Sequence, residues 1–267
     1  GRIRLNFSGQ VEKDVTVFGR FSARTYFGEK AGYGLNAGSA DSAGALDQYG
    51  IKLVSNDWTY KLGRQGVNLG QGAIISTGYD AVGCDNKFDG IVASGKFGKV
   101  DTNIIFGKTN SALDGNPANW MGFDLSAPVG DTFTLGAAYA SEKVTDVTTS
   151  APARKYMAVN ATFAPSEQFT LNGEWVKSST SGDNPHNSAY FIAGTYSWDK
   201  DSFSIQYNNV GINAVDGANS GIGGSLYPYK GLGLVYSTTS SLVPAAGADT
   251  KYTGFTYTYS YQMSKVA

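Results

Sequence analysis

Arginines at regular spacing are the residues of this sequence best suited to chemistry. Arg2 and Arg4 alternate with apolar residues at the start of the chain, and Arg20 and Arg24 recur at even spacing in the next apolar run. Side chains two positions apart point to the same face of an extended strand, so these guanidinium groups would share one surface. Arginine stays ionised even among like charges, and the surface would therefore be positive throughout the physiological pH range.

Residues for covalent catalysis or metal binding are scarce. His186 is the only histidine and Cys84 the only cysteine among 267 residues, which excludes an internal disulfide and a zinc site built from several Cys and His ligands. A Ser-His-Asp triad would have to use His186, which lies in the loop-like sequence GDNPHNS. We therefore expect no enzymatic activity, no cofactor and no metal ion, with Cys84 a passive loop residue.

The elements that would carry the arginines are β-strands. Residues 2–11 and 15–27 predict a hairpin around the turn EKD, and similar alternating runs recur to the end of the chain. No apolar run approaches the roughly 20 residues that a membrane-spanning helix needs. Further strands are expected at 47–54, 58–65, 87–97, 100–108, 120–127, 132–142, 154–163, 169–177, 189–198, 202–211 and 251–263. Residues 229–250 are ambiguous, either holding a strand at 229–237 or belonging to one very long loop.

The connections between these strands alternate in length. Short turns are expected at 12–14, 55–57, 98–99, 128–131, 164–168 and 199–201, and long connections at 28–46, 66–86, 109–119, 143–153, 178–188 and 212–228. In an outer-membrane barrel, short turns lie on the periplasmic side and long loops on the extracellular side. A β-sandwich gives no reason for this sorting, so the pattern favours a transmembrane antiparallel up-and-down β-barrel.

Composition agrees with a barrel in lipid. Only 41% of residues are hydrophobic, yet 13% are aromatic and 35 are glycine, as expected where only every second residue faces lipid. The alternative from composition alone is a soluble glycine-rich all-β protein. A net charge of −1 gives no support for nucleic-acid binding. The predicted lipid-facing residues are Ile3, Leu5, Phe7, Val17, Phe21, Ile51, Leu53, Ile104, Phe106, Phe123, Leu125, Leu135, Phe169, Leu171, Ile205, Tyr207, Phe255 and Tyr257.

The two ends of the sequence suggest an incomplete barrel. The chain begins directly in a strand, and it stops at SKVA without a closing strand. An open sheet edge in lipid leaves backbone groups unpaired, and bacterial barrels have even strand numbers. We therefore expect residues 1–267 to be a single barrel domain that lacks a strand or two at each end.

Several segments resemble the outer-membrane porins of diderm Firmicutes. They are RIRLNFSGQVEKDVTVFGRFSART, WTYKLGRQG, GVNLGQGAIISTGYDAVGCDN and FDGIVASGKFGKVDTNIIFGK. The resemblance implies a 16-stranded barrel in the full protein, a homotrimer and a location in the outer membrane. It also implies that 66–86 is the third extracellular loop, which folds inward and narrows the channel. The family's stalk and S-layer-homology domain are absent from this chain, so contact with the cell wall would need that missing domain.

Projecting the alternation inward predicts a basic wall opposite an acidic loop. The basic wall consists of Arg2, Arg4, Arg20, Arg24, Lys52, Lys61 and Lys96, and the constriction loop carries Asp80 and Asp85. Opposed charges would set up a field over about 8 to 10 Å, which is comparable to a pore radius. Asp101, Asp124 and Glu174 also project inward and would make the selectivity mild. The alternative is that these residues only solvate a polar wall.

Two smaller features complete the expected site. Arg64 falls on the apolar side of its strand unless a bulge redirects it. Phe18, Tyr156 and Phe191 face inward by parity, where they could contact sugars. The leading hypothesis is a water-filled channel for passive diffusion of ions and small hydrophilic solutes. The competing hypothesis is a surface adhesin or envelope-tethering barrel with no open channel.

Overall fold

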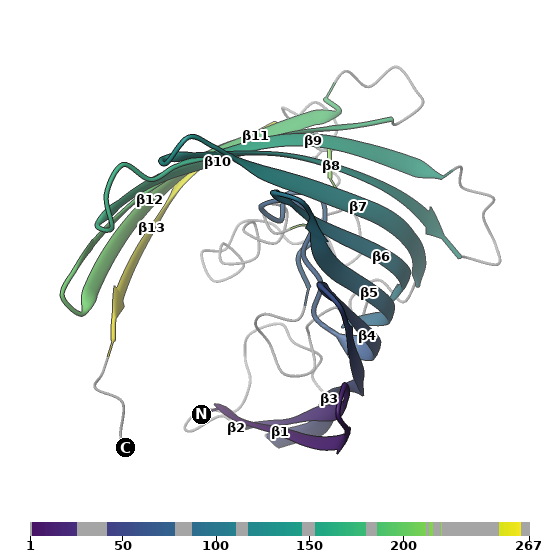
Figure 1. Cartoon of the computed structure of the whole chain (residues 1–267). Coiled ribbons are helices and arrows are strands. Elements are labelled where there is room, and N and C mark those ends of the chain that lie inside the picture. Colours follow the sequence, from purple (N-terminus) through teal and green to yellow (C-terminus); the bar gives the residue numbers. More distant parts are fainter. Residues whose placement is uncertain are drawn as a thin grey trace.

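The computed structural model describes residues 2–25, 42–77, 87–110, 117–145, 153–179, 186–211, 214–215, 220 and 251–262. Within these residues, thirteen strands form one antiparallel up-and-down sheet, in which each strand pairs with its neighbours in sequence. They are β1 (Arg2–Glu12), β2 (Val15–Thr25), β3 (Ser42–Ser55), β4 (Trp58–Gln65), β5 (Lys87–Phe97), β6 (Val100–Asn110), β7 (Ala118–Val129), β8 (Phe133–Val144), β9 (Arg154–Phe163), β10 (Phe169–Ser178), β11 (Ser188–Trp198), β12 (Asp201–Gly211) and β13 (Lys251–Tyr261). The sheet curves strongly around a concave side, and β1 and β13 are its edges (Figure 1).

The strands agree closely with those expected from the alternating pattern. The bounds of β4, β5 and β9 match the prediction, and the other strands except β3 differ by no more than about two residues at either end. The alternative strand at 229–237 lies outside the described residues. The described residues contain thirteen strands, so the expected number of 16 strands in the full protein stays a prediction.

The start of β3 was predicted wrongly because the strand contains a bulge. It begins at Ser42 rather than at residue 47. Phe21 pairs with Leu46 and Arg20 pairs with Gln48, so Asp47 has no partner on β2. One extra residue reverses the alternation upstream of it. Reading back from Ile51 would place Asp47 among the outward residues, whereas the structure buries it.

The convex side of the sheet, here called the outer face, is apolar and exposed. Every residue of the predicted lipid-facing set is exposed except Tyr207. Tyr207 is half-buried because its ring packs against Tyr190 and Phe255, with centroids 6.0 and 5.1 Å apart. Aromatic pairs also lie on this face near the short turns, namely Trp58–Phe97, Phe133–Phe163 and Tyr196–Trp198. Such an apolar band with aromatic residues at its border is the surface that a barrel presents to lipid.

The buried apolar residues lie on the concave side, here called the inner face. They combine residues 67–75 of the connection between β4 and β5 with inward side chains such as Trp120, Tyr156 and Val176. Residues 66–77, the described part of this connection, run into the concavity of the sheet (Figure 1). Within the described ranges, no helix is long and apolar enough to cross a membrane.

Candidate functional site: a loop anchored inside the barrel

The connection after β4 folds into a small hairpin, residues 67–77, called here the inner hairpin. The Leu69 amide donates to the Ile75 carbonyl at 3.2 Å, and the Thr77 amide donates to the Val67 carbonyl at 2.8 Å. At the tip, the Gly72 amide donates to the Leu69 carbonyl at 3.0 Å. These bonds pair part of the hairpin backbone internally, and the remaining buried polar groups need partners on the barrel wall.

Two carboxylates of the opposite wall hold the tip of the inner hairpin. Asp124 on β7 accepts a hydrogen bond from the Gly70 amide at 3.0 Å. Glu174 on β10 accepts from the amides of Gln71 and Ala73 at 3.2 and 2.8 Å. The hairpin leaves the sheet at β4, so these contacts extend it across the inner face to β10. The predicted inward folding of the loop is thus confirmed for residues 66–77.

The Gln71 side chain adds a second set of contacts to the same wall. Its amide nitrogen donates to the Ala161 carbonyl at 3.1 Å and to the Thr162 hydroxyl at 3.0 Å. Its oxygen accepts from the Asn172 amide at 3.2 Å. Backbone and side-chain contacts together fix the tip at one position on β9 and β10.

Glycine is required at the tip of the inner hairpin. Gly70 has φ +60°, and a Cβ added there would lie 2.2 Å from the Glu174 Oε1 atom. Gly72 has φ +95°, a conformation that other residues rarely adopt. Gly70 therefore lets the backbone approach the Glu174 carboxylate, and Gly72 permits the tight turn.

Apolar side chains hold the rest of the inner hairpin. Leu69, Ile74 and Ile75 are fully buried. The Ser220 hydroxyl, from beyond β12, donates to the Ala73 carbonyl.

Sequence reasoning missed the anchoring role of Asp124 and Glu174. It placed both on the inner face, which is correct, but assigned them only a partial offset of the basic wall. They lie 54 and 103 residues from Gly70 and Gln71, which they bind. No spacing or motif in the sequence connects positions so far apart.

The predicted basic wall is partly neutralised by ion pairs. Arg20 forms two hydrogen bonds to Asp47, from Nε at 2.7 Å and from a terminal nitrogen at 2.8 Å. The Ser22 hydroxyl also donates to Asp47 at 2.8 Å, and Lys87 Nζ lies 3.9 Å from the same carboxylate. The bulge in β3 creates this pair by turning Asp47 inward. Arg20 is therefore part of a nearly buried ion pair.

The other predicted wall residues differ in whether they form ion pairs. Lys96 forms an exposed ion pair with Asp101 at 3.0 Å. Lys52 and Lys61 are register partners on β3 and β4, and in the described part of the chain neither forms an ion pair. Arg4 is half-buried on β1. The side chains of Arg2 and Arg24, together with Asp80, Cys84 and Asp85, lie outside the described residues.

Arg64 stays on the outer face, where it pairs with a carboxylate. It donates two hydrogen bonds of 2.8 Å to Asp89 on β5, and its guanidinium lies 5.7 Å from the centre of the Tyr49 ring. No bulge is needed, because its charge is compensated near the long-connection end of the strands.

Two of the three inward aromatic residues that could contact sugars, Tyr156 and Phe191, are not accessible to a solute. Tyr156 is buried, its ring stacks on Trp120 at 5.8 Å, and its hydroxyl donates to Glu142. Phe191 is also buried. Packing against neighbouring side chains therefore removes both rings from solutes, and Phe18 alone stays half-accessible.

Replacing Asp47 by alanine should destabilise the folded protein by about 2 to 3 kcal/mol. The reason is that Arg20 loses two charge-assisted hydrogen bonds in a site where little water replaces them. Urea unfolding in lipid vesicles would measure the change. The matched control is Asp101→Ala, which removes an exposed pair and should change stability by less than about 1 kcal/mol. Equal effects of the two variants would contradict this role of Asp47.

Comparison with known proteins shows which fold this chain shares. No protein-family model matches the sequence, and no curated protein matches it. Among solved structures, the chain is similar to Salmonella typhi OmpF in complex with daunomycin, with 12% identity, a TM-score of 0.51, and coverage of 97% of this chain and 89% of OmpF. It also matches OmpT, an outer-membrane protein of Vibrio cholerae, with 10% identity and a TM-score of 0.47 over 98% of this chain and 89% of OmpT.

A third match is a variant of the Rh. blastica porin, with 14% identity, a TM-score of 0.47, and coverage of 78% of this chain and 74% of that porin. The likeness to OmpF shows the fold. The chain has the porin-type β-barrel fold. At identities of 10 to 14% these structures carry no residue roles over to this chain. The inner hairpin and its anchors are therefore argued from this chain alone.

Proposed function

We propose that this chain forms the wall of a water-filled channel in the outer membrane, through which ions and small hydrophilic solutes diffuse passively. One observation carries the proposal: the inner hairpin crosses the inner face and is anchored by Asp124 and Glu174. A loop fixed in this way narrows the lumen at one level. The apolar outer face and polar inner residues supply the lipid-facing and water-facing surfaces that such a channel requires.

The proposed channel has no catalytic role and takes no cofactor. Residues 1–267 act as one barrel domain, and three copies assemble as a homotrimer in the membrane. The competing function is a surface adhesin or an envelope-tethering barrel without an open channel.

Single-channel recording in planar bilayers separates the two functions. The full protein should give stepwise conductance, and a solute-swelling assay with small sugars should show that uptake falls with solute size. An adhesin or anchor with a closed lumen gives no conductance steps, and that result would overturn the proposal.

Charge selectivity should depend on Lys52 and Lys61, which form no ion pair among the described residues, rather than on Arg20. Replacing Lys52 and Lys61 by glutamine should move the reversal potential in a salt gradient toward cations, because two uncompensated charges leave the inner face. The shift should shrink in molar salt, where the Debye length falls to about 3 Å. An unchanged reversal potential at low salt would show that these lysines do not line the conducting path.

A further inference from the structure

A row of lysines runs along the outer face near the long connections. It occupies four of five consecutive strands, from β6 to β10. The residues are Lys108, Lys143, Lys155 and Lys177, with Asn119 on the intervening strand β7. All five side chains are exposed and share the parity of the apolar band.

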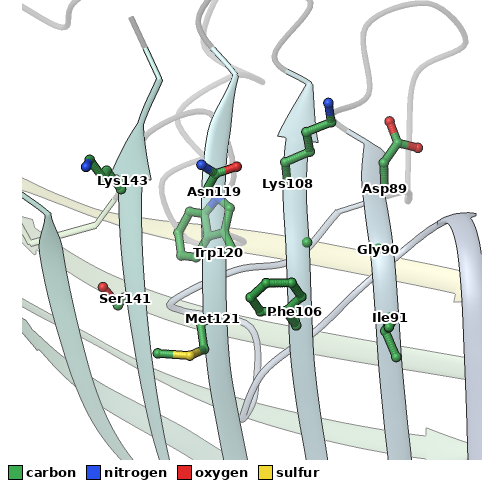
Figure 2. A pocket seen from close by; sticks show the side chains of 11 residues that line it. Asp89, Gly90, Ile91, Phe106, Lys108, Asn119, Trp120, Met121, Ser141 and Lys143 are labelled. Carbon is green, nitrogen blue, oxygen red and sulfur yellow. The ribbon is translucent and has the colours of Figure 1, made fainter.

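A groove of about 620 Å³ lies on the outer face at one end of this row. The polar side chains along one side of the groove belong to register partners on neighbouring strands: Lys108 pairs with Asn119, and Asn119 pairs with Lys143. Phe106 and Met121 are register partners two positions further along the same strands, and both are strongly exposed. Figure 2 shows Lys108 and Asn119 above Phe106 and Met121 on β6 and β7. The groove thus joins a cationic margin to an apolar floor.

In the described part of the chain, the positive charge of this margin has no dedicated acidic partner. Asp89, the register partner of Lys108, is the acidic residue among the described lining residues, and both of its oxygens already accept hydrogen bonds from Arg64. Among the described residues, neither Lys108 nor Lys143 forms an ion pair. Two strand spacings separate them, or about 10 Å, so one anionic headgroup can lie between them.

We propose that this groove binds a membrane lipid with a phosphate headgroup. The phosphate lies between Lys108 and Lys143, which donate ammonium hydrogen bonds, and Asn119 donates from its amide. The acyl chain lies along Phe106 and Met121 toward the membrane midplane. Basic residues at the headgroup level attract anionic lipids, and the buried part of the chain adds apolar contact. The inference rests on the outer face lying in lipid, as the proposed function requires.

Lipid binding can be measured by native mass spectrometry of the purified full protein. The probes are phosphatidylglycerol and phosphatidylcholine with identical acyl chains. The wild-type protein should retain phosphatidylglycerol preferentially, and the Lys108→Gln, Lys143→Gln double variant should bind it roughly thirtyfold more weakly. The control is the Lys52→Gln, Lys61→Gln double variant, which removes the same charge from the inner face and should keep the preference.

Three outcomes would overturn the lipid site. The first is equal retention of the two lipids by the wild-type protein. The second is an equal loss of phosphatidylglycerol binding in both double variants. The third is that the Lys108→Gln, Lys143→Gln variant converts an oligomer into monomers without a change in lipid preference. The last outcome would assign the groove to a contact between subunits. Channel conductance tests the proposed function separately: a protein that prefers phosphatidylglycerol but conducts no ions would retain the lipid site and lose the channel.

Discussion

Replacing Asp124 by asparagine and Glu174 by glutamine is expected to release the inner hairpin and to raise single-channel conductance. Each wild-type carboxylate accepts backbone N–H groups from the tip, at distances from 2.8 to 3.2 Å. Hydrogen bonds to charged groups contribute about 1.5 to 3 kcal/mol each and neutral ones about 0.5 to 1.5 kcal/mol. Asparagine and glutamine keep an acceptor oxygen but carry no charge, so weakening the three bonds should destabilise the anchored state by about 3 kcal/mol. That is more than a hundredfold change in the ratio of released to anchored hairpin.

The conductance of single channels at equal salt measures this effect, and exclusion of neutral polymers of graded size reports the pore width. Asp101→Asn is the control: like each of the two anchoring substitutions it removes one inward carboxylate charge, but Asp101 makes no contact with the hairpin in the described residues. Far-UV circular dichroism confirms that each variant has folded. A double variant with the conductance of the wild-type protein would place the constriction elsewhere.

Replacing Ile205 by arginine should destabilise the barrel by about 2 to 4 kcal/mol. Ile205 lies near the middle of β12 on the outer face and is 41% exposed. In the membrane this exposed side chain contacts acyl chains, and an arginine there must place its charge in hydrocarbon. Reversible urea unfolding in lipid vesicles gives the change in the free energy of unfolding.

Ser204→Arg is the control for that experiment. Ser204 precedes Ile205 on the same strand but points inward, where its hydroxyl accepts a hydrogen bond from Thr195 at 3.0 Å. An arginine at this position can reach water, so the loss should be no more than about 1 kcal/mol. A Ser204 variant that is destabilised more than the Ile205 variant would mean that the two faces of the sheet have been assigned in reverse.

The sequence was sufficient for the strands and for their two faces. Side chains alternate along a strand because of backbone geometry alone, so the parity of Ile205 and Ser204 can be predicted without knowing what lies nearby. The alternation of short turns and long connections then predicts an up-and-down sheet. The same local pattern failed at Asp47, because a single unpaired residue in β3 shifts the parity of everything before it.

The tertiary structure alone decided which charged residues meet. Arg20 has the same parity as the other arginines of the predicted wall, and parity alone does not show that it binds Asp47. Glu174 has the parity of an ordinary lumen residue, and it binds the inner hairpin because the curved sheet brings β10 opposite the loop that leaves β4. Alternation fixes the face of each side chain, but curvature and loop closure bring together residues that are 103 positions apart.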